Sequence, residues 1–274
     1  MEENMKLKKL IAGMLLVMMV AAVFTGCKKE ESTGEDNSLQ KVKDAGKLVL
    51  GLDDSFPPMG FRNEDNKIVG FDIDVATEVC KRMGVELELQ PIDWNAKEME
   101  LNSGNIDCIW NGMSIDASRQ EKMNLSEPYL RNEMIFVVAA DSGIETFADL
   151  ADKAVAVQNG STAQTILENS DVYDTLKEAT SFDDNVTAFL TLEAGGCQAV
   201  FLDSVVAEYY ITENDKDFVI LEENLQEEEY AIGFRKADQK LRDEVQKILS
   251  EMKKDGTLGE ISAKWFGSDI TIVE

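Results

Sequence analysis

Polar and aromatic side chains follow apolar segments in both halves of the chain, and together they could bind a zwitterion. Arg119 offers a guanidinium that can hold a carboxylate through two parallel hydrogen bonds. The 160–162 turn opens a segment of helical pattern, and helix N-termini favour anions. Asp203 can accept an ammonium group, and Phe56 and Trp94 can enclose a side chain. An α-amino acid combines these charges.

Each of these residues also has an ordinary structural explanation. Asp203 could cap a helix, 159–162 could form a turn, and Arg119 could be a solvated surface residue. Phe56 lies next to two prolines and could pack within a loop, and Asn111 could satisfy loop backbone. Their shared position after expected strands in both halves favours a binding site, because ligands of open α/β sheets bind beyond the carboxyl ends of strands.

The elements that would position these residues alternate between strands and helices. The expected strands are 47–52, 85–90, 106–110, 134–139, 154–158, 198–202, 218–221 and 230–235. The expected helices are 72–84, with Asp72 as N-cap, 96–103, 162–169, 185–194, 204–213, 239–254 and a last one that carries Trp265 and Phe266. Such alternation predicts largely parallel sheets covered by helices, and its restart predicts two α/β lobes. No linker rich in Pro, Gly or Ser separates them, so we expect strands to cross a hinge.

Composition excludes several functions. The 274 residues carry a net charge of −26, which repels phosphate backbones, so we expect no nucleic-acid partner. The sequence has no histidine, which removes Ser-His and Cys-His nucleophiles and histidine zinc sites. We expect no metal and no cofactor. Cys80, Cys108 and Cys197 are expected to be buried thiols, and the sequence leaves a disulfide among them open.

The first residues read as an export signal. Lys6, Lys8 and Lys9 precede an uncharged apolar run over 10–26 that ends at Cys27. The segment resembles a lipoprotein signal, which is cleaved before Cys27 so that this thiol carries the lipid, although Phe24 stands where Leu is usual. An uncleaved membrane anchor is the alternative. We expect a signal peptide over 1–26 and a flexible polar tether over 27–43.

From about Lys47 to Gly267 the chain resembles the polar amino-acid substrate-binding proteins of ABC importers. The shared blocks are GLDDSFPPMGF at 51–61, VGFDIDVA at 69–76, NGMSIDASR at 111–119, LSEPY at 125–129, QNGSTA at 158–163, VFLD at 200–203 and KDGTLGEISAKWFG at 254–267. The resemblance implies a two-lobed α/β fold of the type II periplasmic-binding-protein kind with a two-strand hinge. Lobe 1 would comprise 44–130 and 228–274, and lobe 2 would comprise 131–227.

The resemblance also implies a role for each site residue. The ligand carboxylate would be bound by Arg119, Ser114 and Thr162, and the ligand ammonium by Asp203 and Gly112. Two aromatic residues would stack on the ligand, Phe56 and Trp94. The side-chain pocket would be lined by Asp53, Asn111, Gln158, Gly160 and Ser161. The chain departs from the family at Asp116-Ala117-Ser118, where Thr-Pro-Glu is usual, and at Asp54, where a small residue is usual. Neutral Asn111 and Gln158 favour a neutral polar ligand, with a basic one as second choice.

The expected function is therefore that of a monomeric, lipid-anchored receptor on the extracellular face of the cell membrane. It would deliver an amino acid to the transmembrane subunits of an ABC permease and catalyse no reaction. An enzyme on the same scaffold is the first alternative, with Glu227 or Glu228 as general acid or base. A sensor domain is the second, and it would normally carry a downstream membrane span or signalling domain, which this sequence lacks before Glu274.

Overall fold

The computed structural model describes residues 35–274, and one compact unit comprises Asp36–Glu274. The expected signal peptide, its cleavage site and Cys27 lie outside the described residues. Within 35–274 none of the helices has the length and apolar character needed to cross a membrane.

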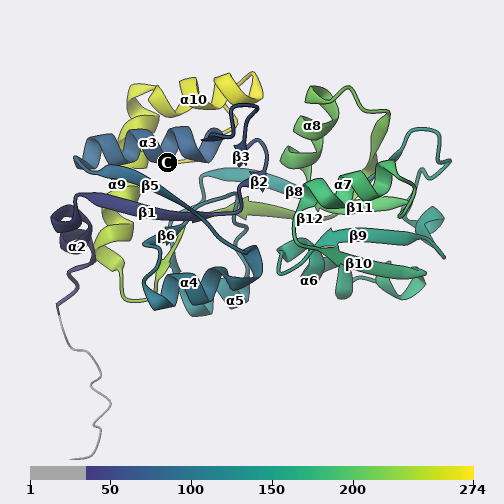
Figure 1. The fold of residues 1–274 in the computed structure, drawn as a ribbon, viewed down its shortest axis with the longest axis horizontal. Helices are drawn as coiled ribbons and strands as arrows, with labels where there is room; N and C mark the ends of the chain where they lie inside the picture. The colour runs from purple at the N-terminus through teal and green to yellow at the C-terminus, as the bar shows by residue number, and fades with distance from the viewer. Residues whose placement is uncertain (1–34) are drawn as a thin grey trace, which may run out of the picture. The chain divides into compact units, whose positions relative to one another are not determined.

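Two five-stranded sheets organise the unit (Figure 1). The first has the order β5-β1-β6-β13-β7, with bounds Glu86–Pro91, Lys47–Leu52, Cys108–Ile109, Gly233–Arg235 and Met123–Leu125. The second has the order β10-β9-β11-β8-β12, with bounds Glu178–Phe182, Ala154–Gln158, Ala199–Asp203, Leu130–Ala139 and Phe218–Tyr230. In each sheet two of the four strand pairings are parallel, β1 with β5 and β6, and β9 with β10 and β11, and the other two are antiparallel, so the sheets are mixed and not largely parallel as expected. We call each sheet with its helices the first and the second lobe.

Helices cover both faces of each sheet (Figure 1). In the first lobe α3 and α10 lie on one face, and α4 and α5 lie on the other. The helices of the first lobe are α2 (Ser38–Ala45), α3 (Phe71–Met83), α4 (Lys97–Ser103), α5 (Ala117–Lys122), α9 (Gln239–Asp255) and α10 (Thr257–Phe266). Those of the second lobe are α6 (Thr162–Glu168), α7 (Asn185–Glu193) and α8 (Ser204–Glu213). A short sheet of β2 (Ser55–Phe56), β3 (Gly60–Arg62) and β4 (Ile68–Val69) joins the first lobe, and short 3-10 turns span Trp94–Ala96, Phe147–Leu150 and Tyr173–Thr175. The predicted α/β architecture with two sheets is confirmed.

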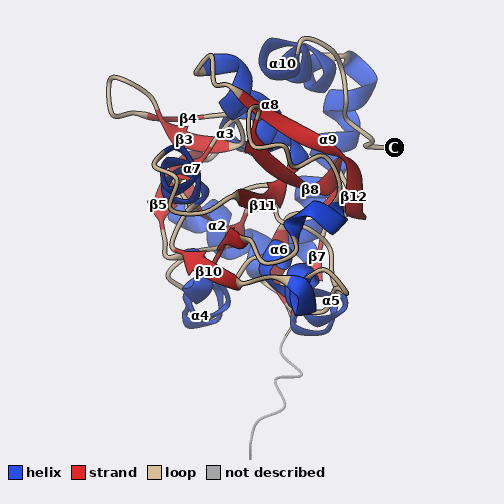
Figure 2. Cartoon of the chain, turned by 90° about the vertical axis from the view of Figure 1, so that its right-hand side faces the viewer, coloured by secondary structure: helices blue, strands red, loops and turns tan. Residues whose placement is uncertain are grey.

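The chain passes into the second sheet along β8 and returns along β12. These two strands pair antiparallel from Leu130 opposite Tyr230 to Ala139 opposite Phe218, with irregular register between Ile220 and Gln226. Figure 2 shows them side by side. Two bonded strands therefore form the connection between the lobes, and the exact residues of the lobe boundaries stay a prediction.

Apolar side chains fill both lobes. Leu48, Leu50 and Leu52 of β1 are buried, and Val75, Ala76 and Val79 of α3 pack into the same cluster. The thiols Cys80, Cys108 and Cys197 are free and buried, and burial raises the pKa of Cys80 to about 12 and that of Cys197 to about 11. The prediction of buried thiols is therefore confirmed.

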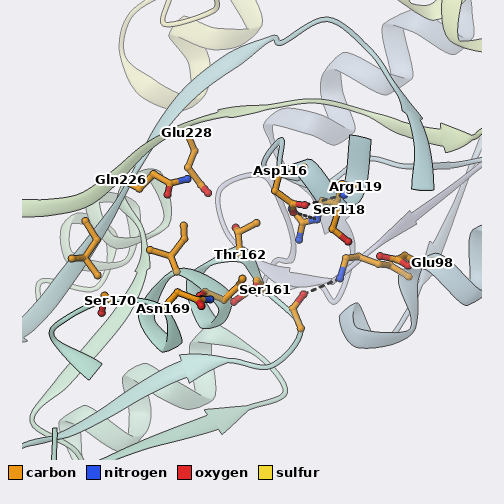
Figure 3. Close-up of a pocket in the computed structure, with 16 residues that line it drawn as sticks. Glu98, Asp116, Ser118, Arg119, Ser161, Thr162, Asn169, Ser170, Gln226 and Glu228 are labelled. Carbon is orange, nitrogen blue, oxygen red and sulfur yellow. Dashed lines mark hydrogen bonds and ion pairs between the residues drawn. The ribbon is translucent and has the colours of Figure 1, made fainter. Parts of the chain in front are cut away.

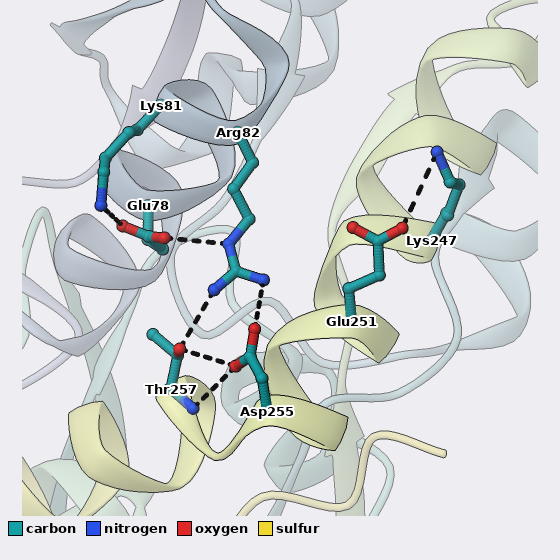
Figure 4. A network of polar contacts seen from close by, with 7 residues as sticks. All are labelled: Glu78, Lys81, Arg82, Lys247, Glu251, Asp255 and Thr257. Carbon is teal, nitrogen blue, oxygen red and sulfur yellow. Dashed lines mark hydrogen bonds and ion pairs between the residues drawn. The ribbon is translucent and has the colours of Figure 1, made fainter.

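A polar network fastens α3 to the turn between α9 and α10 (Figure 4). Arg82 donates to Asp255 at 2.7 Å and to Thr257 at 3.0 Å, while Glu78 on the same helix accepts from Arg82 at 2.9 Å. Half-exposed ion pairs contribute at most about 1 kcal/mol each, so this network orients the helices more than it stabilises them.

Two sequence expectations fail in this part of the fold. The flexible tether was expected to reach residue 43, but α2 begins at Ser38, and Ser38 and Val42 are buried. The backbone N–H of Leu241 donates to the Ser38 hydroxyl at 3.1 Å, which anchors α2 to α9. Asp72 is not the N-cap of its helix, because α3 begins at Phe71 after Gly70 and the Asp72 carboxylate points inward.

Candidate functional site

One small cavity between the lobes is lined by ten of the twelve ligand-site residues expected from the sequence. They are Phe56, Trp94, Asn111, Gly112, Ser114, Arg119, Gln158, Ser161, Thr162 and Asp203. The cavity measures about 10 Å³, roughly the room for a single water molecule. An amino acid needs far more space, so a ligand can enter only when the lobes separate. The roles of the individual residues stay predictions.

Hydrogen bonds join the lobes around this cavity. Gln158 Nε2 donates to Asp53 Oδ2 at 2.7 Å, and Thr162 Oγ1 donates to Ser114 Oγ at 3.2 Å. The ammonium of Lys97 donates to the carbonyl of Gly160 at 2.9 Å. Asp53 and Gly160 are the two expected residues outside the cavity wall, but Asp53 is bonded to the wall residue Gln158 and Gly160 directly precedes the wall residue Ser161. The arrangement is that of two lobes in contact.

Arg119 on α5 is buried and held in one orientation. Its Nη1 donates to the carbonyl oxygen of Ser114 at 2.7 Å, and its Nε lies 3.1 Å from Oδ2 of Asp116. Asp116 also caps α5 by accepting from the Arg119 backbone N–H. The guanidinium is therefore oriented before any ligand arrives, but part of its charge is offset by Asp116.

Asp203 ends β11 and opens α8, yet its side chain does not cap that helix. Its Oδ1 instead accepts from Asn132 Nδ2 at 2.8 Å and from the Tyr230 hydroxyl at 2.6 Å. Burial, and then the charge of Glu228, raises the pKa of Asp203 to about 7. A cation beside this carboxylate would remove the cost of its buried charge. Sequence reasoning missed Asn132 and Tyr230.

The Asp72 carboxylate holds the backbone of Gly112 in place. The Gly112 backbone N–H donates to Asp72 Oδ2 at 2.7 Å, and the Tyr129 hydroxyl donates to the same oxygen at 3.0 Å. Gly112 has a φ of 56°, and a Cβ there would lie 2.9 Å from the Phe56 ring, so no larger residue fits. Burial raises the pKa of Asp72 to about 7.

The side-chain end of the cavity is acidic. Asp53 is buried, and its backbone N–H donates to Asn111 Oδ1 at 3.0 Å. Burial raises the pKa of Asp53 to about 6. A hollow of about 260 Å³ adjoins this end and is lined by Asp53, Asp54, Ser55, Ile92, Asp93, Trp94, Asp183 and Asp184. Asp54 pairs with Arg62 at 2.6 Å and is partly exposed.

A larger groove of about 620 Å³ opens on the other flank, beside Arg119 (Figure 3). It shares Arg119, Ser161 and Thr162 with the cavity, and Glu228 reaches it from β12. Glu227, the neighbour of Glu228, is exposed and lines a different groove behind the hinge strands. Neither glutamate belongs to the wall of the small cavity.

Two α/β lobes joined by paired strands, with charged residues from both around one cavity, define a solute-binding protein of the type II periplasmic-binding-protein fold. Residues 48–268 match the model of the bacterial extracellular solute-binding proteins, family 3, and the chain belongs to that family.

Relatives agree with this membership. The chain is 31% identical over 270 residues to the L-cystine-binding protein TcyJ of Escherichia coli K12, and the alignment covers 97% of this chain and 100% of the relative. It is 32% identical to the arginine-binding extracellular protein ArtP of Bacillus subtilis, over 92% of this chain and 97% of the relative. A histidine-bound substrate-binding protein of an ABC uptake transporter from Streptococcus pneumoniae superimposes with a TM-score of 0.83, at 36% identity over 87% and 99% of the two chains.

Proposed function

We propose that this protein binds a free amino acid between its two lobes outside the cell and delivers it to the permease of an ABC importer. Lipid attachment through Cys27 would keep it at the membrane, and a monomer would suffice. Family membership supports the class of function, and the motif before Cys27 supports the anchor.

One observation carries the proposal: groups of opposite charge from different lobes surround one cavity. Arg119 belongs to the first lobe, whereas Asp203 and the start of α6 at Thr162 belong to the second. A ligand carboxylate would pair with Arg119 and the N-terminal end of α6, and its ammonium would pair with Asp203 and the Gly112 carbonyl. Only a molecule with both charges would satisfy both sides at once, and an α-amino acid is such a molecule.

The mechanism that follows is capture by closure. A ligand that contacts both lobes stabilises the closed arrangement by its differential affinity for that arrangement. The bonds Gln158–Asp53 and Lys97–Gly160 close only when the lobes meet, so they add to the stability of the closed form. The permease would then recognise the closed form.

The ligand is proposed to have a polar side chain. Asn111 and Gln158 could recognise a neutral polar group. The charges favour the basic alternative, because Asp53 is buried and pairs with no cation in the described part of the chain, and four further aspartates line the adjoining hollow. A cationic side chain would relieve the cost of this unpaired charge.

The test is a thermal-shift screen of the exported chain against the twenty amino acids and L-cystine, followed by calorimetry. We expect a raised melting temperature with at least one amino acid, because a ligand that binds only the folded state stabilises it by mass action. Arg119→Ala and Asp203→Ala should abolish binding, while Asp141→Ala, at an exposed turn of the second lobe, should leave it intact. Full affinity in the Arg119→Ala and Asp203→Ala variants would refute the site.

A further inference from the structure

Glu228 is a buried carboxylate that the proposed binding mechanism does not use. It lies on β12 opposite Asn132 of β8 and is 6% exposed. Among residues 35–274, neither of its side-chain oxygens makes a hydrogen bond of good geometry and no ion pair reaches it, although the Ser114 hydroxyl and the Asn132 amide lie close by. Figure 3 shows the side chain directed from its strand toward Thr162 and the groove beside Arg119. An ionised carboxylate in such a place is costly unless a cation offsets it.

Arg119 is the cation that stabilises the ionised form of Glu228. Asp116, which caps the helix that carries Arg119, disfavours the ionised form of Glu228 because its own charge is negative. Asp203 and Glu228 also repel each other. Since Asp116 already pairs with the Nε of Arg119, the guanidinium offsets Glu228 only in part. The other charged residues of the two grooves that Glu228 borders are Lys97, Glu98, Arg131, Glu133, Glu208, Glu222, Glu227 and Glu229.

A ligand carboxylate bound at Arg119 would change this balance in two ways. It would engage the charge of Arg119, and it would add a negative charge close to Glu228. Both effects disfavour ionised Glu228. We propose that Glu228 takes up a proton when a ligand carboxylate binds Arg119, so that it acts as a positioning residue that couples anion recognition to proton uptake. This inference rests on the proposed function.

The surroundings of Glu228 can serve both of its protonation states. Burial is the largest influence and raises its pKa, whereas the Ser114 hydroxyl and the Asn132 amide lower it by favouring the ionised form. Each of these two side chains also carries an oxygen that could accept from the O–H of a protonated Glu228. Ser114 also lines the ligand cavity, so a protonated Glu228 would steady a residue of the carboxylate end.

Binding that takes up a proton weakens as the pH rises. Asp203 acts in the opposite direction, because a ligand ammonium lowers its pKa and releases a proton. A comparison of the wild-type protein with Glu228→Gln separates the proton uptake at Glu228 from the proton release at Asp203. The amide has the shape of the protonated acid but cannot titrate. Glu227→Gln, at the exposed position next in sequence, is the matched control.

The experiment is calorimetry at pH 6 and 8 with L-arginine, L-histidine, L-cystine and L-glutamine, each in two buffers of different ionisation enthalpy. Wild type and Glu227→Gln should take up more protons than Glu228→Gln, by as much as about one per ligand, and Glu228→Gln should bind about 5-fold or more tightly than wild type at pH 8. Equal proton numbers in wild type and Glu228→Gln would overturn the proposal.

Two further outcomes are decisive. If the wild-type protein binds none of the twenty amino acids and not L-cystine in the thermal-shift screen, the proposed function fails and takes this inference with it. If Glu228→Gln does not show a cooperative melting transition, Glu228→Ala replaces it in the same comparison, and an unchanged proton number there counts against the role of Glu228.

Discussion

The side-chain amide of Gln158 donates to the Asp53 carboxylate at 2.7 Å, and this bond joins the second lobe to the first at one end of the ligand cavity. Gln158 is itself held by Asn185, whose Nδ2 donates to its Oε1 at 3.3 Å. The amide therefore presents its N–H to a carboxylate that pairs with no cation among the described residues. A cationic ligand group could engage Asp53 beside this amide.

Asp53→Asn tests the preference for a basic ligand. The variant should lose affinity for L-arginine by about 10-fold or more, because an ion pair with a buried carboxylate is lost, while the affinity for uncharged L-citrulline should hold or rise. Asp54→Asn is the control, because Asp54 already pairs with Arg62. Calorimetry that finds the two ligands equally affected would point to a neutral side chain instead.

Gly160→Ala should hinder lobe closure. A Cβ at Gly160 would lie 2.9 Å from Asn95 Oδ1 and 3.0 Å from Asn95 Cα, in the other lobe. Gly143→Ala is a matched control in the second lobe, with a φ of 71° against 68° and no atom within 4 Å of the new Cβ. Both variants should lose about 1 kcal/mol of stability from backbone strain. Only Gly160→Ala should weaken ligand binding in calorimetry; equal affinities would show that this contact does not limit closure.

Tyr230→Phe removes a donor to Asp203. The hydroxyl is buried and 2.6 Å from the carboxylate, so ionised Asp203 should become less stable and the ligand affinity should fall by about 10- to 100-fold at pH 7. Tyr210→Phe removes a similar bond, from the Tyr210 hydroxyl to Glu193 at 3.0 Å, away from the cavity. Its affinity should match that of the wild type. A loss common to both variants would indicate general destabilisation.

The ligand-free protein should lose stability as the pH rises from about 4 to 7. Asp53, Asp72 and Asp203 have pKa values of about 6, 7 and 7, so the folded state keeps protons that the unfolded chain loses near pH 4. The stability that these protons contribute is therefore fully present below about pH 4 and is lost once the pH has risen through the folded pKa values. Asp72→Asn should flatten the dependence of unfolding free energy on pH, because Asp72 alone accounts for about 4 kcal/mol of the decline between about pH 4 and 7. Urea denaturation at several pH values measures this, and an unchanged slope would contradict the assignment.

Helix α2 should contribute to the stability of the first lobe. Val42 is 2% exposed and packs in the core, so Val42→Ala should lower the unfolding free energy by about 1–2 kcal/mol. Lys41→Ala, on the exposed side of the same helix, should have little effect. Equal melting temperatures for the two variants would mean that α2 is dispensable.

The sequence predicted the residues that lie at the ends of strands better than those that support them. Arg119 and Asp203 could be chosen because each follows an apolar segment, whereas Gln158 was implied only by the resemblance to the amino-acid-binding proteins. Asn132 and Tyr230 lie within strands, so their contact with Asp203 depends on how β8 and β12 pass β11, and no local pattern encodes that. Asp72 was predicted to be an N-cap because it precedes an apolar stripe. Its actual contact, with the backbone of Gly112, depends on the tertiary fold and has no local sequence pattern.

Several elements escaped prediction, among them β10 and α2, whose residues lack a strong apolar pattern. Edge strand β10 contains no fully buried residue, and the only large apolar side chain in it is Phe182. The α2 segment is mostly polar, and its few buried side chains become recognisable only once α9 is present beside it.

The burial of Cys80, Cys108 and Cys197 has a practical consequence. Thiolates are the reactive form of cysteine, and these three thiols are both covered and hard to deprotonate. A cysteine introduced at Ser118 or Asn169, on opposite walls of the groove in Figure 3, would be the readily labelled thiol within residues 35–274. A dye attached there would change its surroundings as the walls approach, so the protein lends itself to conversion into an optical sensor for its ligand.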